Sequence, residues 1–117
     1  MKNVILVDES YKLALDVVDL YQNMRASNER VISRQLLKSG TSIGANIKES
    51  GYAETNEEVV RKLKHALKEC NETMYWLELI RDSKIYDKDT TDIHNECRNV
   101  LRLLSRAIAS YPKKVKK

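Results

Sequence analysis

Few residues of this sequence combine a reactive side chain with the spacing of a catalytic or metal site. His65 and His94 are far apart, and neither has a second histidine or an acid at a spacing that suggests a metal, so we expect both at the surface or rim of the fold. Cys70 and Cys97 fall in apolar seams, where a buried thiol has a raised pKa and behaves as a small hydrophobe. The motifs HExxH, the P-loop and paired Glu-x-x-His do not occur. The sequence therefore predicts no catalytic residue, no metal and no cofactor, and we expect no enzyme.

The basic side chains are concentrated towards one end. The formal charge is +4, but residues 98–117 hold seven basic and no acidic side chains, whereas residues 1–97 hold 14 basic and 17 acidic ones. Basic residues also recur at helical spacing, where they could hold phosphates or could equally be a solvated face. We expect RNA or DNA, or alternatively an acidic protein, to contact the stripes Arg98, Arg102, Arg106 and Arg30, Arg34, Lys38, together with Lys113, Lys114, Lys116 and Lys117.

Helical periodicity accounts for nearly all of the 117 residues. Apolar side chains recur at spacings of three and four in four segments. The pair Thr55 and Glu58 is a capping box that predicts the start of the third helix. The expected seams include Leu13, Val17, Leu20 and Met24 in the first helix, Leu63, Leu67, Cys70, Met74 and Leu77 in the third, and Cys97, Leu101, Leu104, Ile108 and Tyr111 in the fourth. The composition has 42% hydrophobic and 32% charged residues, three Gly, one Pro and no Phe, which favours a helical fold over a β-rich one. We predict an all-α, antiparallel up-down-up-down four-helix bundle over 1–112, with helices at about 8–25, 29–53, 56–83 and 89–111 and a disordered basic tail at 113–117.

All three glycines lie close together on the second predicted helix. Gly40, Gly44 and Gly51 project to one side of a helical wheel, and each weakens a helix by roughly 0.5–1 kcal/mol relative to Ala. Close approach of another helix backbone would offset this cost, so we interpret them as helix-packing residues. A phosphate loop would need a different spacing.

Two helices carry a second apolar face opposite their seams. These faces comprise Tyr75, Trp76 and Leu79 on the third helix and Tyr11, Leu15 and Val18 on the first. A single copy of the chain would leave the only Trp in water, so we predict that these faces are buried between subunits. Short polar residues on the second helix, Ser42, Asn46 and Glu49, suit either a contact with another helix or subunit or a solvated surface.

The cysteine content and the length of the apolar runs indicate where the protein is located. Two cysteines do not make a disulfide framework, and the N-terminal sequence has too short an apolar run for a signal peptide. No segment approaches the roughly eighteen apolar residues of a membrane span. We expect a cytoplasmic protein with no membrane contact.

The central helices resemble a known family. The segments Ser39-Gly40-Thr41-Ser42-Ile43-Gly44-Ala45-Asn46-Ile47-Lys48-Glu49 and Ala66-Leu67-Lys68-Glu69-Cys70-Asn71-Glu72-Thr73-Met74-Tyr75-Trp76-Leu77 are similar to those of the 23S ribosomal-RNA intervening-sequence proteins. The resemblance implies a four-helix bundle that assembles as a pentameric ring and has no assigned enzymatic activity. A related family, the accessory variability proteins of retroelements, resembles a basic pentameric barrel that binds nucleic acid. After Glu49 the chain lacks the Arg that many members have, so no phosphate contact is expected there.

Two functions remain open from the sequence. The first is a non-enzymatic homo-oligomer that binds RNA or DNA, ribosomal RNA included, through its basic surfaces. The second is a structural or protein-interaction module with no nucleic-acid role.

Overall fold

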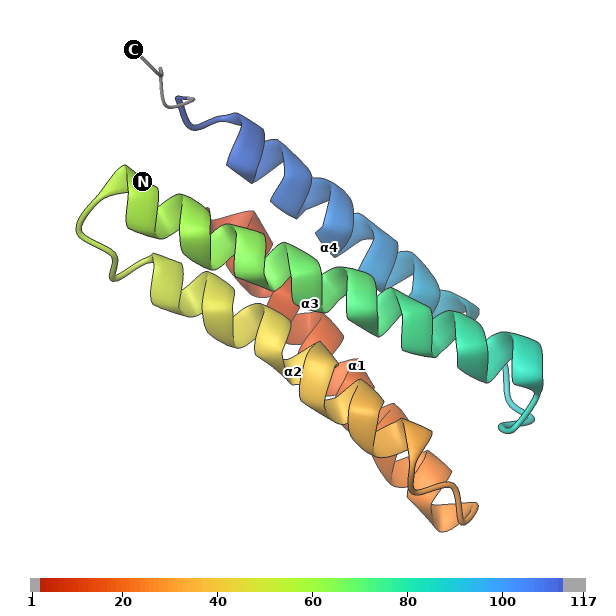
Figure 1. The fold of residues 1–117 in the computed structure, drawn as a ribbon. Coiled ribbons are helices and arrows are strands. Elements are labelled where there is room, and N and C mark those ends of the chain that lie inside the picture. The colour runs from red at the N-terminus through yellow and green to blue at the C-terminus, as the bar shows by residue number, and fades with distance from the viewer. Residues whose placement is uncertain (1–2, 113–117) are drawn as a thin grey trace.

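The chain forms four α-helices in a computed structural model that describes residues 3–112. These are α1 (Val4–Ala26), α2 (Ile32–Ser50), α3 (Asn56–Ser83) and α4 (Thr91–Ala109), and no strand occurs among the described residues. Consecutive helices run in opposite directions (Figure 1). Each helix packs against its two neighbours in the cycle α1, α2, α3, α4, while the backbones of the diagonal pairs α1/α3 and α2/α4 lie farther apart in the described chain. The predicted all-α four-helix bundle is confirmed; the predicted tail at 113–117 lies outside the described residues.

Side-chain caps set the starts of the first two helices. α1 begins at Val4, earlier than the expected residue 8, because the Asn3 side chain accepts a hydrogen bond from the Leu6 N–H at 3.0 Å. α2 begins at Ile32 rather than at residue 29, since Glu29 stays outside the helix and its carboxylate accepts from three backbone N–H groups of the first turn. Partial burial acts to raise the pKa of Glu29, but these hydrogen bonds hold it below its ordinary value.

The other two helices begin at acidic or hydroxyl caps. Thr55 Oγ1 accepts from the Glu58 N–H at 3.1 Å, as the sequence pattern predicts, while the Glu58 carboxylate accepts from the Glu54 N–H instead of the Thr55 N–H. Asp89 accepts from both the N–H and the hydroxyl of Thr91. α2 and α4 are each shorter than the expected ranges, ending at Ser50 and Ala109.

The core lies along the bundle axis, but two helices are rotated from their predicted seams. On α1, all four predicted seam residues are buried. On α3 and α4, the larger seam residues Leu67, Met74, Leu101 and Ile108 are only half-buried, and the fully or nearly fully buried positions include Ala66, Thr73, Val100 and Ala107. Small side chains at the contact let the helix backbones approach more closely, which explains the rotation.

The buried polar contact between α2 and α3 is internally satisfied. The Thr73 hydroxyl lies 2.9 Å from the Ser39 hydroxyl and 2.8 Å from the Glu69 carbonyl oxygen, to which it donates. Both side chains are buried. Each hydroxyl therefore avoids the free-energy cost of a buried polar group without a partner.

Two of the three glycines lie where α2 approaches α1. A Cβ at Gly40 would lie 2.8 Å from both Cγ atoms of Val17, and one at Gly44 would lie 3.5 Å from the Ser10 carbonyl oxygen. The expectation is wrong for Gly51, which follows the last residue of α2, is exposed and meets no neighbouring helix.

Over the described residues, no helix is long and apolar enough to span a bilayer.

Candidate nucleic-acid interface

The outer face of α4 presents a row of arginines. Arg98, Arg102 and Arg106 are exposed, and no carboxylate of residues 3–112 forms an ion pair with them. Two asparagines three residues earlier hold two of the guanidinium groups: Arg98 donates to Asn95 Oδ1 at 3.2 Å, and Arg102 donates to Asn99 Oδ1 at 2.8 Å. The remaining guanidinium N–H groups face solvent, as a phosphate contact requires.

The positioning asparagines were missed in the sequence. The Asn99 amide also donates to Glu9 Oε1 on α1 at 3.4 Å, so it connects the arginine row to the neighbouring helix. The repeated Asn-x-x-Arg spacing, at residues 95 to 98 and 99 to 102, was the available signal.

A second basic face lies on the opposite corner of the bundle. Arg30 directly precedes α2, and Arg34 and Lys38 lie on its exposed side. None of the three forms an ion pair within residues 3–112. Since α2 and α4 are diagonal, the two basic faces point away from each other. The four lysines expected to extend the α4 face, Lys113, Lys114, Lys116 and Lys117, lie outside the described residues.

The other diagonal pair carries the exposed apolar residues. On α1, Tyr11 and Leu15 are 64% and 53% exposed, and Val18 is half-buried beside them; on α3, Tyr75 is 56% exposed and Leu79 half-buried. Because α1 and α3 are diagonal in the bundle, these apolar faces lie on its opposite sides. Apolar and basic outer faces therefore alternate around the four helices.

The position of Trp76 differs from the expectation that a single copy of the chain leaves this side chain in water. Its ring is half-buried and packs against the core of its own chain, so a single copy does not leave it in water. The Tyr75 ring meets it edge-on, with ring centroids 5.1 Å apart. Trp76 Nε1 is closed off from solvent and has no acceptor among residues 3–112.

The polar residues expected on a contact surface of α2 are engaged within the chain. Asn46 is buried, and its amide donates to the Ser42 carbonyl oxygen at 2.9 Å and lies 3.2 Å from the Ser42 hydroxyl. Glu49 pairs with Lys62 of α3 at 3.3 Å. Their contacts thus lie within α2 and between α2 and α3.

The two cysteines form a buried pair of thiols between α3 and α4. Cys70 Sγ and Cys97 Sγ are 3.8 Å apart, and both side chains are fully buried. The hydrogen bond with Cys97 and the burial raise the pKa of the Cys70 thiol above its ordinary value. A thiol held in this protonated state is a poor nucleophile.

His94 differs from the surface position expected for it. It is buried between α4 and α3, and its Nε2 lies 3.0 Å from the Leu77 carbonyl oxygen, while Nδ1 has no partner within the described chain. Burial, with the nearby charge of Arg81, lowers its pKa. His65 is exposed, 3.7 Å from Glu69.

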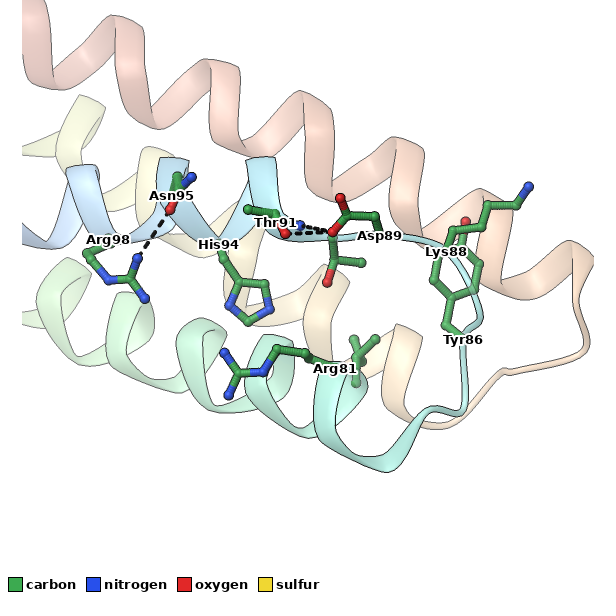
Figure 2. A pocket seen from close by; sticks show the side chains of 10 residues that line it. Arg81, Tyr86, Lys88, Asp89, Thr91, His94, Asn95 and Arg98 are labelled. Atoms are coloured by element: carbon green, nitrogen blue, oxygen red, sulfur yellow. Dashed lines mark hydrogen bonds between the residues drawn. The ribbon is translucent and has the colours of Figure 1, made fainter.

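The pocket beside His94 has a volume of about 260 Å³ (Figure 2). Its charged lining includes Arg81, Lys88 and Arg98 with Asp89, and Arg81 is already paired with Asp82 at 2.8 Å. No group of three metal-ligating side chains occurs in the part of the chain that the structure describes. The pocket therefore offers no arrangement of nucleophile, base and metal.

Comparisons with known proteins add a family and a fold. Residues 2–106 match the family model of the 23S rRNA-intervening sequence protein. The chain is also similar to a crystal structure of a protein of unknown function from the S23 ribosomal protein family of Bacteroides thetaiotaomicron. The two share 41% sequence identity, with a TM-score of 0.82 over 90% of this chain and 99% of that one. Among curated proteins no match is found.

Proposed function

The chain belongs to the family of the 23S rRNA-intervening sequence proteins, and on this basis we propose that it is a non-enzymatic ring of identical subunits that binds RNA or DNA. Ribosomal RNA is the first candidate ligand, because the family is described by its association with a ribosomal-RNA gene segment. The binding surfaces are the basic faces of α2 and α4, and the subunit contacts are the apolar faces of α1 and α3.

The row of Arg98, Arg102 and Arg106 is the observation that carries nucleic-acid binding. All three are exposed, and none of them forms an ion pair with a carboxylate among residues 3–112. Each guanidinium keeps several N–H groups for phosphate oxygens, and one helical turn separates successive arginines. Such a row binds the sugar-phosphate backbone without reading the base sequence.

The ring is supported by the position of the apolar faces. A twofold dimer would bury the same face of both copies, whereas here two different apolar faces lie on opposite sides of one subunit. Contact of the α1 face of one copy with the α3 face of the next is a head-to-tail interface, which closes into a ring when the rotation permits. We propose five subunits, the number that the family resemblance implies. The basic faces of α2 and α4 then point into and out of this ring.

Cytoplasmic location is part of the same proposal. The two cysteines are free thiols 3.8 Å apart, a state that reducing compartments maintain.

Fluorescence anisotropy with a labelled, structured RNA across a salt series tests nucleic-acid binding. We expect the affinity of the wild-type chain to fall steeply with salt. Arg102→Gln should lower the slope of log K against log salt by about one, because it removes one cation from the phosphate backbone. Arg25→Gln is the matched control, since Arg25 is exposed on α1 and stacks on Tyr21. A salt-independent signal, or equal effects of both variants, would contradict the assignment to α4.

A further inference from the structure

A groove between α1 and α4 carries an excess of negative charge and is separate from the two basic faces. Its volume is about 610 Å³, and it lies next to the loop that joins α3 to α4. Five carboxylates line it against two ammonium groups, Lys12 and Lys88. The carboxylates are Asp16 and Asp19 of α1 with Asp89, Asp92 and Glu96 in and before α4.

Two polar groups in this groove have no partner. Tyr86 is only 8% exposed, and its hydroxyl makes no hydrogen bond within residues 3–112. Figure 2 shows its ring extending from the loop before α4 towards α1. Glu96 Oε1 is also closed off from solvent without a partner in the described residues. The closed-off Glu96 oxygen calls for a hydrogen-bond donor, and the Tyr86 hydroxyl lines the same groove with no partner among residues 3–112.

The electrostatic surroundings of Glu96 point to a missing positive charge. Burial, the adjacent Asp16 carboxyl and the charge of Asp92 raise the pKa of Glu96 to about 7, and only Lys12 opposes them. A cation seated in the groove would favour the charged form of Glu96 and relieve the repulsion between the two helices.

We propose that the groove binds a linear polyamine, a chain of ammonium groups separated by three or four methylene groups. Asp92 and Glu96 lie one turn apart on α4, and Asp16 and Asp19 lie about one turn apart on α1. The helix pitch of about 5.4 Å is close to the distance between successive ammonium groups of such a chain. The ammonium N–H groups supply the donor that Glu96 Oε1 lacks, and the Tyr86 hydroxyl oxygen can accept from the same molecule.

An extended polycation fits these carboxylates better than a metal ion does. No three metal-ligating side chains of residues 3–112 converge on one point, so the negative charge is spread along the groove. Several charge pairs, each weak by itself at a surface, then act on one molecule.

Isothermal titration calorimetry with spermidine, on full-length protein freed of nucleic acid by nuclease and high salt, tests the site. We expect saturable 1:1 binding per subunit, weakened about tenfold in Glu96→Gln and severalfold in Tyr86→Phe. Binding should be tighter at pH 8 than at pH 6, because Glu96 is charged at the higher pH. Glu54→Gln is the matched control, since it removes the same charge from an exposed position before α3.

Three results would overturn the proposal. The first is the absence of saturable heat with spermidine. The second is equal weakening of spermidine binding by Mg²⁺ and Na⁺ at the same ionic strength, which would mean that salt simply screens the negative charge. The third is tetralysine binding more tightly than spermidine with the same dependence on Glu96, which would assign the groove to a basic protein segment. Tyr86→Phe keeps the aromatic ring in place. The affinity of this variant for spermidine therefore tests the site even if Glu96→Gln alters folding.

Discussion

Gly40 and Val17 pack so closely that a Cβ on Gly40 would lie 2.8 Å from both Cγ atoms of Val17. Both residues are fully or almost fully buried where α2 meets α1. Valine is branched at Cβ and has one strongly preferred rotamer in a helix, so it cannot turn away. The close approach of these two helices therefore depends on the hydrogen side chain at residue 40.

Gly40→Ala should destabilise the fold by about 1–3 kcal/mol, because overpacking outweighs the better helix propensity of alanine. Chemical denaturation monitored by circular dichroism measures this free energy. Gly51→Ala is the matched control and should change stability little, since Gly51 is exposed. Equal stability of Gly40→Ala and the wild type would show that the helices can separate without cost.

The buried thiols should be unreactive in the native state. Cys70 and Cys97 are fully exposed to reagent only on unfolding, and the raised pKa of Cys70 keeps its thiol protonated. We expect an aromatic disulfide reagent to titrate both thiols in denaturant and neither in native buffer over the same minutes. Fast labelling of the native protein would mean that α3 and α4 separate readily.

Glu96 should make stability depend on pH between about 4.5 and 7. Its pKa is raised from 4.5 to about 7 in the folded chain, so the folded state holds more protons and stability falls as pH rises through this range. Glu96→Gln removes this dependence and should be more stable than wild type at pH 8, by about 1 kcal/mol after allowing for solvent screening.

Thermal denaturation of both proteins at pH 5 and pH 8 checks the pH effect. His94 changes the stability with pH in the opposite direction, because its lowered pKa favours the folded state at higher pH. This contribution is the same in both proteins, so it cancels when the stability of the wild type is subtracted from that of the variant. An unchanged difference at the two pH values would place Glu96 in a solvated environment.

Polar substitutions on the apolar faces should reduce the size of the assembly. Tyr11→Ser with Leu15→Ser on α1, or Tyr75→Ser on α3, removes exposed apolar area without touching the core. Light scattering should then report smaller particles, while Val31→Ser, at a residue before α2 that is 74% exposed, should leave the mass unchanged. A constant mass in all variants would exclude both faces from the interface.

The helices were predictable because local signals fix them. The seam of α1 follows from apolar spacing alone, and the start of α3 follows from the pair Thr55 and Glu58. The rotation of α3 was not predictable, since Thr73 looks neutral in a pattern of large apolar residues. Its burial depends on Ser39, which is 34 residues away in the sequence.

The basic faces were predictable in the same way, since one turn separates Arg98 from Arg102. Pairing between distant helices was not predictable. Asp16 and Glu96 become neighbours only when α1 packs on α4, and His94 becomes buried only when α3 covers it. Residues whose environment depends on such tertiary contacts show no periodic signal of their own.

Native mass spectrometry of the protein purified at low salt, before and after nuclease treatment, tests the central proposal most directly. The proposal predicts a particle of five times the 13.6 kDa subunit mass, carrying additional mass that nuclease or high salt removes. A single-subunit mass, or an assembly that carries no nucleic acid at any salt concentration, would contradict it.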